Sequence, residues 1–165
     1  LACAGVPPGQ RLARALASET LSDSVGTCPT PGRFDVVRAD PVVLIDACHN
    51  PQSVETFLTA VRNVEPEVAR RPMLLCAVLA DKDVHGIVEL LAPEFPSVAV
   101  TQTSSPRALP ARELADIFAE CGNSPVAVYG SVAEATSALE DRSYVACGSI
   151  TTAGEVSGIV RGSDR

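Results

Sequence analysis

Residues 42–51 of this chain read VVLIDACHNP, and this short stretch decides the fold. Four aliphatic residues in succession, Val42 to Ile45, are typical of a strand that is buried on both faces, as strands of parallel sheets are. The run ends at Asp46, and a helix-start signal follows His49, since asparagine is a good N-cap and proline fits the first helical position. The sequence therefore predicts a strand, a polar turn and a helix that begins at Pro51.

The expected helix has one apolar face. Apolar residues recur along it at helical spacing, namely Val54, Phe57, Leu58 and Val61. In open α/β sheets, ligands bind at the carboxyl ends of the strands, and the N–H groups that begin a helix favour anions. The turn formed by residues 46–50 is therefore a favoured position for a binding site.

The rest of the chain repeats this unit of strand and helix. Apolar runs predict further strands at 72–79, 97–101, 126–129 and 143–147. Amphipathic segments predict helices that begin near residues 84, 111 and 132. The alternating segment 34–38 predicts a hairpin with the first strand. We therefore expect an α/β fold: a Rossmann-like, mostly parallel sheet of about six strands with one antiparallel edge strand and helices on both faces.

Charge and hydropathy exclude several kinds of partner. The formal net charge is −7 and no basic patch is visible, so we expect neither nucleic acid nor an anionic membrane as a partner. The apolar runs are far shorter than a membrane span. Six cysteines occur singly, without the paired spacing of zinc or redox sites, and Cys76 and Cys147 lie within strand-like runs. These features predict a cytoplasmic protein with reduced, buried thiols.

The first part of the chain has a different composition. The chain begins with leucine and its only methionine is Met73, so we expect a fragment of a longer polypeptide. A helix is predicted over residues 9–20, followed by a linker rich in Ser, Thr, Gly and Pro. We expect residues 1–28 to be the remnant of a preceding domain with its linker, and residues 29–165 to form one domain.

Polar side chains follow the predicted strands, at what would be one edge of the sheet. They are Asp46, His49, Lys82, Asp83, Arg107 and Ser149. Asp46 could be a phosphoacceptor, a metal ligand or a hydrogen-bond anchor, and His49 could orient a ligand or exchange a proton near neutral pH. Cys48 lies beside His49 but lacks a third, orienting group, so a thiol nucleophile is disfavoured.

The other polar residues also have both structural and functional interpretations. Lys82 and Arg107 could contact an anion or be ordinary loop charges, and Asp83 could contact phosphate or cap a helix. Ser149 could donate a hydrogen bond to a carboxylate or cap a helix. No G-x-x-x-x-G-K-[ST] or G-x-G-x-x-G motif is present, so any ATP must be held mainly by another domain. We predict no metal-ligand set in the chain.

Five separate stretches together match the pattern of one family. They are PGRF at 31–34, DACHNP at 46–51, DKD at 81–83, PRALP at 106–110, and GS at 148–149 with GEV at 154–156. On these residues the chain resembles the C-terminal domain of folylpolyglutamate synthase and dihydrofolate synthase, members of the Mur ligase superfamily. Family members more often read Asp-Gly-Ala-His-Asn in the second stretch, and Ala47 lacks the freedom that glycine has in a tight turn.

The resemblance implies an ATP-dependent carboxylate–amine ligase that adds L-glutamate to folate or dihydropteroate. In such enzymes ATP with Mg²⁺ phosphorylates the carboxylate, and the amine of glutamate attacks the acyl phosphate. The ATP-binding loop belongs to an N-terminal ATPase domain of the same polypeptide. The resemblance therefore implies that the C-terminal domain is inactive without that domain.

The resemblance also implies roles for individual residues. It implies that the nucleotide is contacted by Arg33, Asp46, Asn50 and Lys82. It implies that glutamate is contacted by His49 and Ser149, and that His49 also has a catalytic role. Asp83 and Arg107 match the family pattern less specifically. From the residues alone, a rival interpretation is a receiver-like regulatory or binding α/β module in which Asp46 accepts phosphate. The chain lacks the acidic pair after its first strand that would hold magnesium in such a module.

Overall fold

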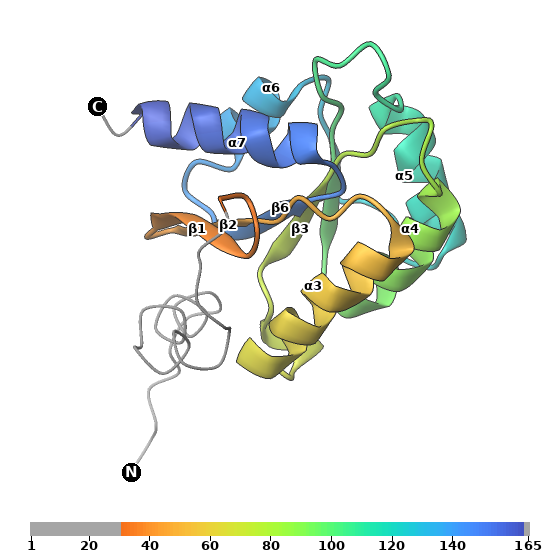
Figure 1. Ribbon diagram of the computed structural model, residues 1–165, viewed down its shortest axis with the longest axis horizontal. Coiled ribbons are helices and arrows are strands. Elements are labelled where there is room, and N and C mark those ends of the chain that lie inside the picture. Colours follow the sequence, from red (N-terminus) through yellow and green to blue (C-terminus); the bar gives the residue numbers. More distant parts are fainter. Residues whose placement is uncertain (1–30, 164–165) are drawn as a thin grey trace.

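The computed structural model describes residues 31–163, and within them six strands form one sheet in the order β1-β2-β6-β3-β4-β5 (Figure 1). β1 (Asp35–Ala39) lies at one edge and pairs antiparallel with β2 (Val42–Ile45). The remaining pairs are parallel and involve β3 (Met73–Cys76), β4 (Val98–Val100), β5 (Ala127–Val128) and β6 (Tyr144–Cys147). The predicted fold class is confirmed, including the antiparallel edge strand. The helix predicted over residues 9–20 and the boundary near residue 28 lie outside the described residues.

Helices cover both faces of the sheet (Figure 1). One face carries α3 (Pro51–Val64), α4 (Val84–Leu91) and α5 (Ala111–Glu120), and the other carries α6 (Val132–Ala138) and α7 (Ile150–Ser163). Two short 3₁₀ helices, η1 (Val68–Arg70) and η2 (Ala92–Glu94), lie at helix-to-strand connections. The carboxyl ends of the parallel strands therefore form one edge, from which the chain leaves toward either face.

The aliphatic run of β2 explains why this strand is buried on both faces of the sheet. Val42 and Leu44 pack into the core beneath α3, α4 and α5, whereas Val43 and Ile45 pack into the core beneath α6 and α7. All four side chains are buried, as successive side chains of a strand point to opposite faces. Each such burial contributes about 1.5–3 kcal/mol, which makes an unbroken aliphatic run favourable here.

The insertion of β6 between β2 and β3 brings distant turns together. At the carboxyl edge, the backbone N–H of Asp46 donates to the oxygen of Ala146 at 3.0 Å, and that of Ala77 donates to the oxygen of Cys147 at 3.2 Å. The turns that follow β2, β6 and β3 are therefore neighbours in space, although they are far apart in sequence.

The helix that begins at Pro51 forms as predicted. The side chain of Asn50 accepts a hydrogen bond from the N–H of Ser53 at 2.8 Å, and Pro51 occupies the first turn, where its missing N–H costs nothing. The four predicted apolar residues of α3 are buried. Asp83 caps α4 by accepting from the N–H of Gly86 at 3.0 Å, which confirms the capping interpretation for that residue.

Two elements differ from the predictions. The predicted strand 72–79 leaves the sheet after Cys76, because the N–H of Leu109 from the loop after β4 donates to Val78 at 2.9 Å and Leu79 forms an antiparallel bridge with Ala108. The helix α7 was not predicted. Its threonines and its glycines at 154, 158 and 162 are weak helix formers that hide the helical pattern.

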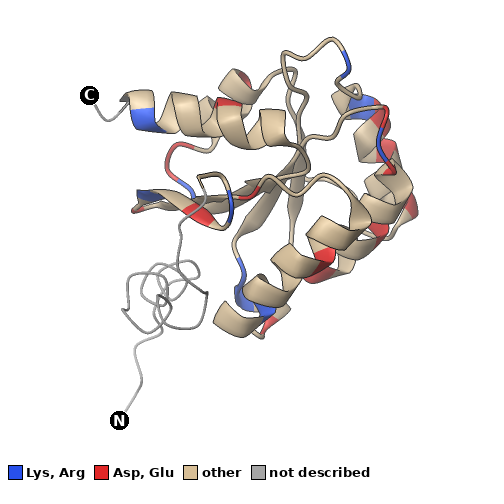
Figure 2. Ribbon diagram, viewed as in Figure 1, with Lys and Arg blue, Asp and Glu red and all other residues tan. Residues whose placement is uncertain are grey.

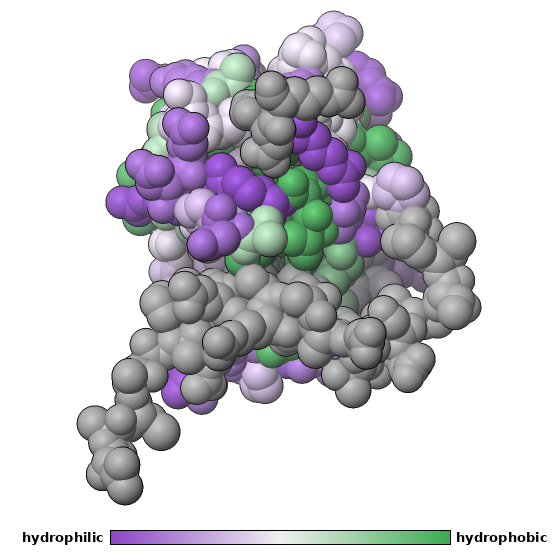
Figure 3. All heavy atoms as spheres, turned by 90° about the vertical axis from the view of Figure 1, so that its left-hand side faces the viewer, coloured by the Kyte–Doolittle hydropathy of each residue, from purple (hydrophilic) through white to green (hydrophobic). Residues whose placement is uncertain are grey.

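Thiols and charged side chains of residues 31–163 are spread over the domain. The four cysteines of the described part, Cys48, Cys76, Cys121 and Cys147, are free thiols. Lysine and arginine positions are dispersed over loops and element ends (Figure 2). The face at the left of Figure 1 is mostly hydrophilic around a small apolar area (Figure 3). No helix within residues 31–163 is long and apolar enough to cross a membrane.

The opposite, amino edge of the sheet is stabilised by a buried arginine. The side chain of Arg71 is 2% exposed, and its guanidinium donates to backbone oxygens of Glu65, Pro66 and Glu94 and pairs with the Glu94 carboxylate. Arg62 at the end of α3 also donates to that carboxylate, at 2.7 Å. This network joins α3, the start of β3 and η2.

Replacing Arg71 with leucine should destabilise the domain by about 3–5 kcal/mol, because it leaves buried carbonyl and carboxylate oxygens without their donor. Arg70→Leu is the matched control, since Arg70 is 48% exposed and pairs only with Glu67 on the surface. Urea unfolding followed by circular dichroism measures both variants. Equal effects of the two substitutions would contradict this account.

The same network predicts a pH dependence. The hydrogen bond from Arg62, together with that from Arg71, lowers the pKa of Glu94 below its ordinary value. Its stabilising contribution is therefore complete above the ordinary pKa of an unfolded glutamate and is lost as the pH falls through the lowered, folded-state pKa. The stability difference between the natural chain and Glu94→Gln should shrink over that acidic window, as urea titrations at several pH values would measure. A difference that stays constant in acid would contradict the assignment.

Candidate functional site

The carboxylate of Asp46 joins two segments of the carboxyl edge. Oδ2 accepts a hydrogen bond from the N–H of Phe34 at 2.9 Å, and Oδ1 accepts one from the N–H of Cys48 at 2.8 Å. A backbone bond from Ala47 to the oxygen of Gly32, at 2.7 Å, runs alongside. The PGRF loop and the turn after β2 are thereby held side by side.

The loop that receives this bond has an unusual backbone. Gly32 has a φ of +80° and Phe34 a φ of +45°, a region that costs free energy for a residue with a side chain. The ring of Phe34 packs against that of Phe57 in α3, with centroids 6.2 Å apart, and so helps Asp46 to hold the loop. This arrangement leaves Arg33 exposed between two anchored neighbours.

The turn itself does not require glycine at position 47. Among residues 31–163, Phe34 is the only non-glycine residue with a positive φ, so Ala47 adopts an ordinary backbone conformation. Ala47 therefore does not need the conformational freedom of glycine in this turn.

Burial determines the electrostatics of Asp46. The residue is 5% exposed, and this burial raises the pKa of its carboxyl above the ordinary value. The N–H donors of Phe34 and Cys48 and the nearby guanidinium of Arg33 lower it and offset part of the effect. Because each oxygen already accepts an N–H and is shielded from solvent, the geometry favours an anchor over an accessible phosphoacceptor.

His49 has one defined ring contact. Its Nδ1 lies 3.0 Å from the backbone oxygen of Ala47, and since a carbonyl can only accept, Nδ1 carries the hydrogen. In the neutral ring Nε2 is then unprotonated and can accept a proton or a hydrogen bond. The N–H groups of His49 and Asn50 donate to the hydroxyl of Ser53, at 3.0 and 3.2 Å, so these donors at the start of α3 are already engaged.

Ser149 caps α7 and is 1% exposed. Its Oγ accepts from the N–H of Thr152 at 2.9 Å, and the Thr152 hydroxyl donates to the oxygen of Ala77 at 2.8 Å. The two hydroxyl oxygens are 2.7 Å apart, and Ser149 must donate here because Thr152 has already used its hydrogen. The capping interpretation thus describes Ser149, while a contact with glutamate stays a prediction.

The residue before it must be glycine. Gly148 has a φ of +112°, and a Cβ at this position would lie 2.5 Å from the oxygen of Ala77. The Gly-Ser pair therefore permits the end of β6 to approach the end of β3 closely.

The second group of polar residues lies on the turns after β3 and β4. The guanidinium of Arg107 pairs with the carboxylate of Asp81 at 3.0 Å, and the N–H of Ala80 donates to the oxygen of Arg107 at 2.8 Å. Lys82 is half-buried, and within the described residues its ammonium group has no ion pair. The structure therefore brings Lys82, Asp83 and Arg107 together and separates them from Arg33 by the turn after β6.

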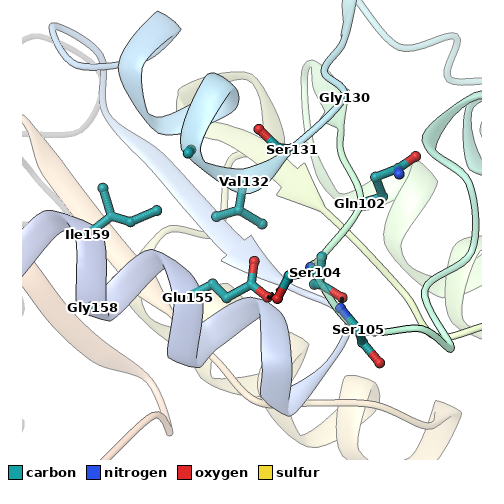
Figure 4. Close-up of a pocket in the computed structure, with 11 residues that line it drawn as sticks. Gln102, Ser104, Ser105, Gly130, Ser131, Val132, Glu155, Gly158 and Ile159 are labelled. Atoms are coloured by element: carbon teal, nitrogen blue, oxygen red, sulfur yellow. Dashed lines mark hydrogen bonds between the residues drawn. The ribbon is translucent and has the colours of Figure 1, made fainter.

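A pocket of about 610 Å³ lies elsewhere, between α7 and the loops after β4 and β5 (Figure 4). None of the site residues predicted from the sequence lines it. Its wall includes Glu155, whose Oε1 accepts from both the N–H and the hydroxyl of Ser104, at 2.9 and 2.6 Å. Sequence reasoning placed Glu155 in the GEV stretch without assigning it a contact. Within residues 31–163, no cluster of three histidine, cysteine or acidic side chains could hold a metal ion.

These features match a known family. Residues 32–148 match the family described as Mur ligase, glutamate ligase domain, a stretch that covers most of the chain. The chain belongs to this family. The DACHNP, DKD and PRALP stretches lie within the matched residues, the PGRF stretch and the Gly148-Ser149 pair overlap their two ends, and the GEV stretch lies beyond them.

Among relatives of this glutamate ligase domain, the dihydrofolate synthase/folylpolyglutamate synthase of Mycobacterium tuberculosis is 37% identical over 103 residues, which cover 62% of this chain and 20% of the relative. The Escherichia coli protein of the same description is 27% identical over 150 residues, covering 88% of this chain and 34% of the relative. The chain thus spans a fifth to a third of the length of these relatives.

Solved structures agree with this relation. The M. tuberculosis folylpolyglutamate synthase complexed with ADP superposes with a TM-score of 0.68 at 31% identity, covering 79% of this chain and 32% of that one. E. coli FolC in complex with DHPP and ADP gives a TM-score of 0.69 at 26% identity, covering 90% of this chain and 36% of that one. The resemblance to the C-terminal domain of folylpolyglutamate synthase and dihydrofolate synthase is confirmed.

Substituting Asp46 with asparagine should destabilise the domain by about 1–3 kcal/mol, because the amide NH₂ replaces one acceptor and leaves the N–H of Phe34 or Cys48 unpaired. Asp40→Asn, in the exposed turn between β1 and β2, is the control and should be nearly neutral. Denaturant unfolding measures the stability, and amide exchange at Phe34 reports the local loss. An unchanged exchange rate at Phe34 would show that Asp46 does not hold the loop.

Proposed function

We propose that this chain is the C-terminal domain of an ATP-dependent ligase that adds L-glutamate to a folate or dihydropteroate carboxylate through an acyl phosphate. The observation that carries the proposal is the Asp46 carboxylate, which holds the PGRF loop and the His49 turn side by side in a member of the glutamate ligase domain family. The names of the relatives and the ADP in two of their structures support the substrate classes. Residues 29–165 would form this domain, and residues 1–28 would belong to a preceding one.

The described residues fit a peripheral contact with a nucleotide. The exposed guanidinium of Arg33 is suited to phosphate oxygens, and Lys82 offers a second cation across the edge. The side chains of Asp46 and Asn50 already hold the loop and the start of α3, so their contribution to nucleotide binding is to fix Arg33 and His49. ATP and Mg²⁺ would therefore be held mainly by an N-terminal domain, with ATP supplying the phosphoryl group.

His49 is the residue we assign to chemistry. Its Nδ1–H is fixed on the oxygen of Ala47, so the neutral ring presents Nε2 as a base at a defined orientation. We assign it to accept a proton from the incoming ammonium group of glutamate, which must be neutral to attack the acyl phosphate. Closure of this edge on another domain would exclude water from that intermediate.

Ser149 serves the glutamate site by its position in this proposal. Its hydroxyl accepts the N–H of Thr152 and donates to the Thr152 hydroxyl. In this proposal Ser149 therefore acts by fixing the residues between β6 and α7 beside His49. Asp83 acts in the same indirect way, since it caps α4 next to Lys82. Arg107 remains a candidate for an anion contact through the guanidinium nitrogens that Asp81 leaves free.

In the complete polypeptide, His49→Ala should lower kcat by about 10²-fold, the usual contribution of a positioned base. His85→Ala is the matched control, because His85 is the other histidine of the chain and lies exposed on α4. The measurement is release of phosphate, which should require ATP, Mg²⁺, a folate or dihydropteroate substrate and glutamate together. Release without glutamate, or equal activity of the two variants, would overturn the assignment, and the isolated domain should release none.

A further inference from the structure

The first turn of α7 is hydrogen-bonded to the residue that follows β3, and its second turn is hydrogen-bonded to the loop after β4. The Thr152 hydroxyl donates to Ala77 at 2.8 Å, as described above. One turn further, the carboxylate of Glu155 accepts both hydrogen bonds that Ser104 can donate, although the two residues are 51 positions apart. Figure 4 shows Glu155 extending from α7 to meet Ser104 at the wall of the pocket.

Ser104 begins a chain of short contacts that ends at the sheet edge. The next residue, Ser105, accepts the N–H of Arg107 on its hydroxyl at 3.2 Å and the N–H of Ala108 on its backbone oxygen at 3.0 Å. The oxygen of Arg107 in turn accepts the N–H of Ala80. The backbone position of Arg107 therefore depends on where Ser104 is held.

Exposed ion pairs alone would hold this loop weakly. Arg107 and Asp81 have side chains that are 61% and 46% exposed, and pairs of this kind contribute little. The Glu155 carboxylate is half-buried and accepts two charge-assisted hydrogen bonds from the exposed Ser104, so the loop has a second, separate attachment. This attachment joins the start of the loop to α7, on the far side of the sheet from α4 and α5, whereas the backbone bond from Leu109 to Val78 and the bridge between Leu79 and Ala108 hold its end.

We propose that Glu155 is a positioning residue: it fixes the loop 102–110 to α7 and so sets Arg107 beside the turn that carries Lys82. The consequence for turnover rests on the proposed function, because Arg107 is an anion contact only under that proposal. The consequence for the loop does not, and it can be tested on this chain alone.

The first test is amide hydrogen exchange on the chain as given. Glu155→Ala should speed exchange of the Ala80 and Ala108 N–H groups by about tenfold or more, as expected for the loss of a hydrogen bond to a charged group. The N–H of Asp46, bonded to Ala146 in the sheet, should change less. Glu155→Gln retains an oxygen acceptor and should largely restore protection.

The neighbouring substitution Gly154→Ala is the control. Gly154 is exposed on α7, and a Cβ there would meet nothing within 4 Å, so exchange in the loop should not change. If Glu155→Ala leaves the loop amides unchanged, or speeds them no more than the N–H of Asp46, Glu155 merely contributes to global stability and the proposal is overturned.

The second test is a double-mutant cycle in the complete polypeptide. If Glu155 acts through Arg107, the pair Glu155→Ala/Arg107→Ala should have the same kcat/KM as Arg107→Ala alone. Losses that multiply would show that Glu155 acts by another route. A polypeptide with no ligase activity would overturn the proposed function, while the exchange experiment would still decide whether Glu155 positions the loop.

Discussion

One carboxylate holds the carboxyl edge of this domain together. Asp46 lies at the end of the aliphatic strand β2, and its two oxygens accept the N–H of Phe34, which precedes β1, and the N–H of Cys48, in the turn after β2. Burying this carboxylate costs free energy, as the raised pKa of Asp46 shows. Burial causes the increase, and the hydrogen bonds offset only part of it. This bridge supports the left-handed backbone of Phe34 together with the packing of its ring against Phe57, and so helps to fix the place of Arg33.

The same edge depends on the close approach of three strands. Gly148 permits the end of β6 to reach the end of β3, and the thiols of Cys48, Cys76 and Cys147 fill the space beneath. Hydrogen bonding to Cys48, hydrogen bonding to Cys76 and burial together raise the pKa of Cys147 well above the ordinary value. The thiol of Cys147 is therefore protonated, and all three side chains are free, buried packing groups, in keeping with the interpretation of Cys76 and Cys147 as reduced, buried residues.

Local pattern predicted the elements well where burial and capping agree. The run at 42–45 and the Asn-Pro pair determine β2 and the start of α3 through interactions that involve near neighbours. The predicted hairpin places Phe34 beside Asp46, but the sequence could not show that the carboxylate accepts the N–H of Phe34, because that bond requires the left-handed backbone of Phe34. The contact of Glu155 with Ser104 could not be predicted either, because it depends on how a distant loop lies against the helix. The helix α7 was not predicted because its glycines and threonines have a low helix propensity, which packing overrides.

The bond that Cys48 gives to Asp46 comes from its main-chain N–H. Any residue except proline could supply that donor, whereas the Cys48 thiol makes a smaller contribution of its own, a side-chain hydrogen bond that lowers the pKa of Asp46. What constrains position 48 is the volume of the core that its side chain fills. A residue of similar volume at position 48 could therefore keep the backbone bond to Asp46, and with it the places of the loop, the histidine and the helix that the turn aligns.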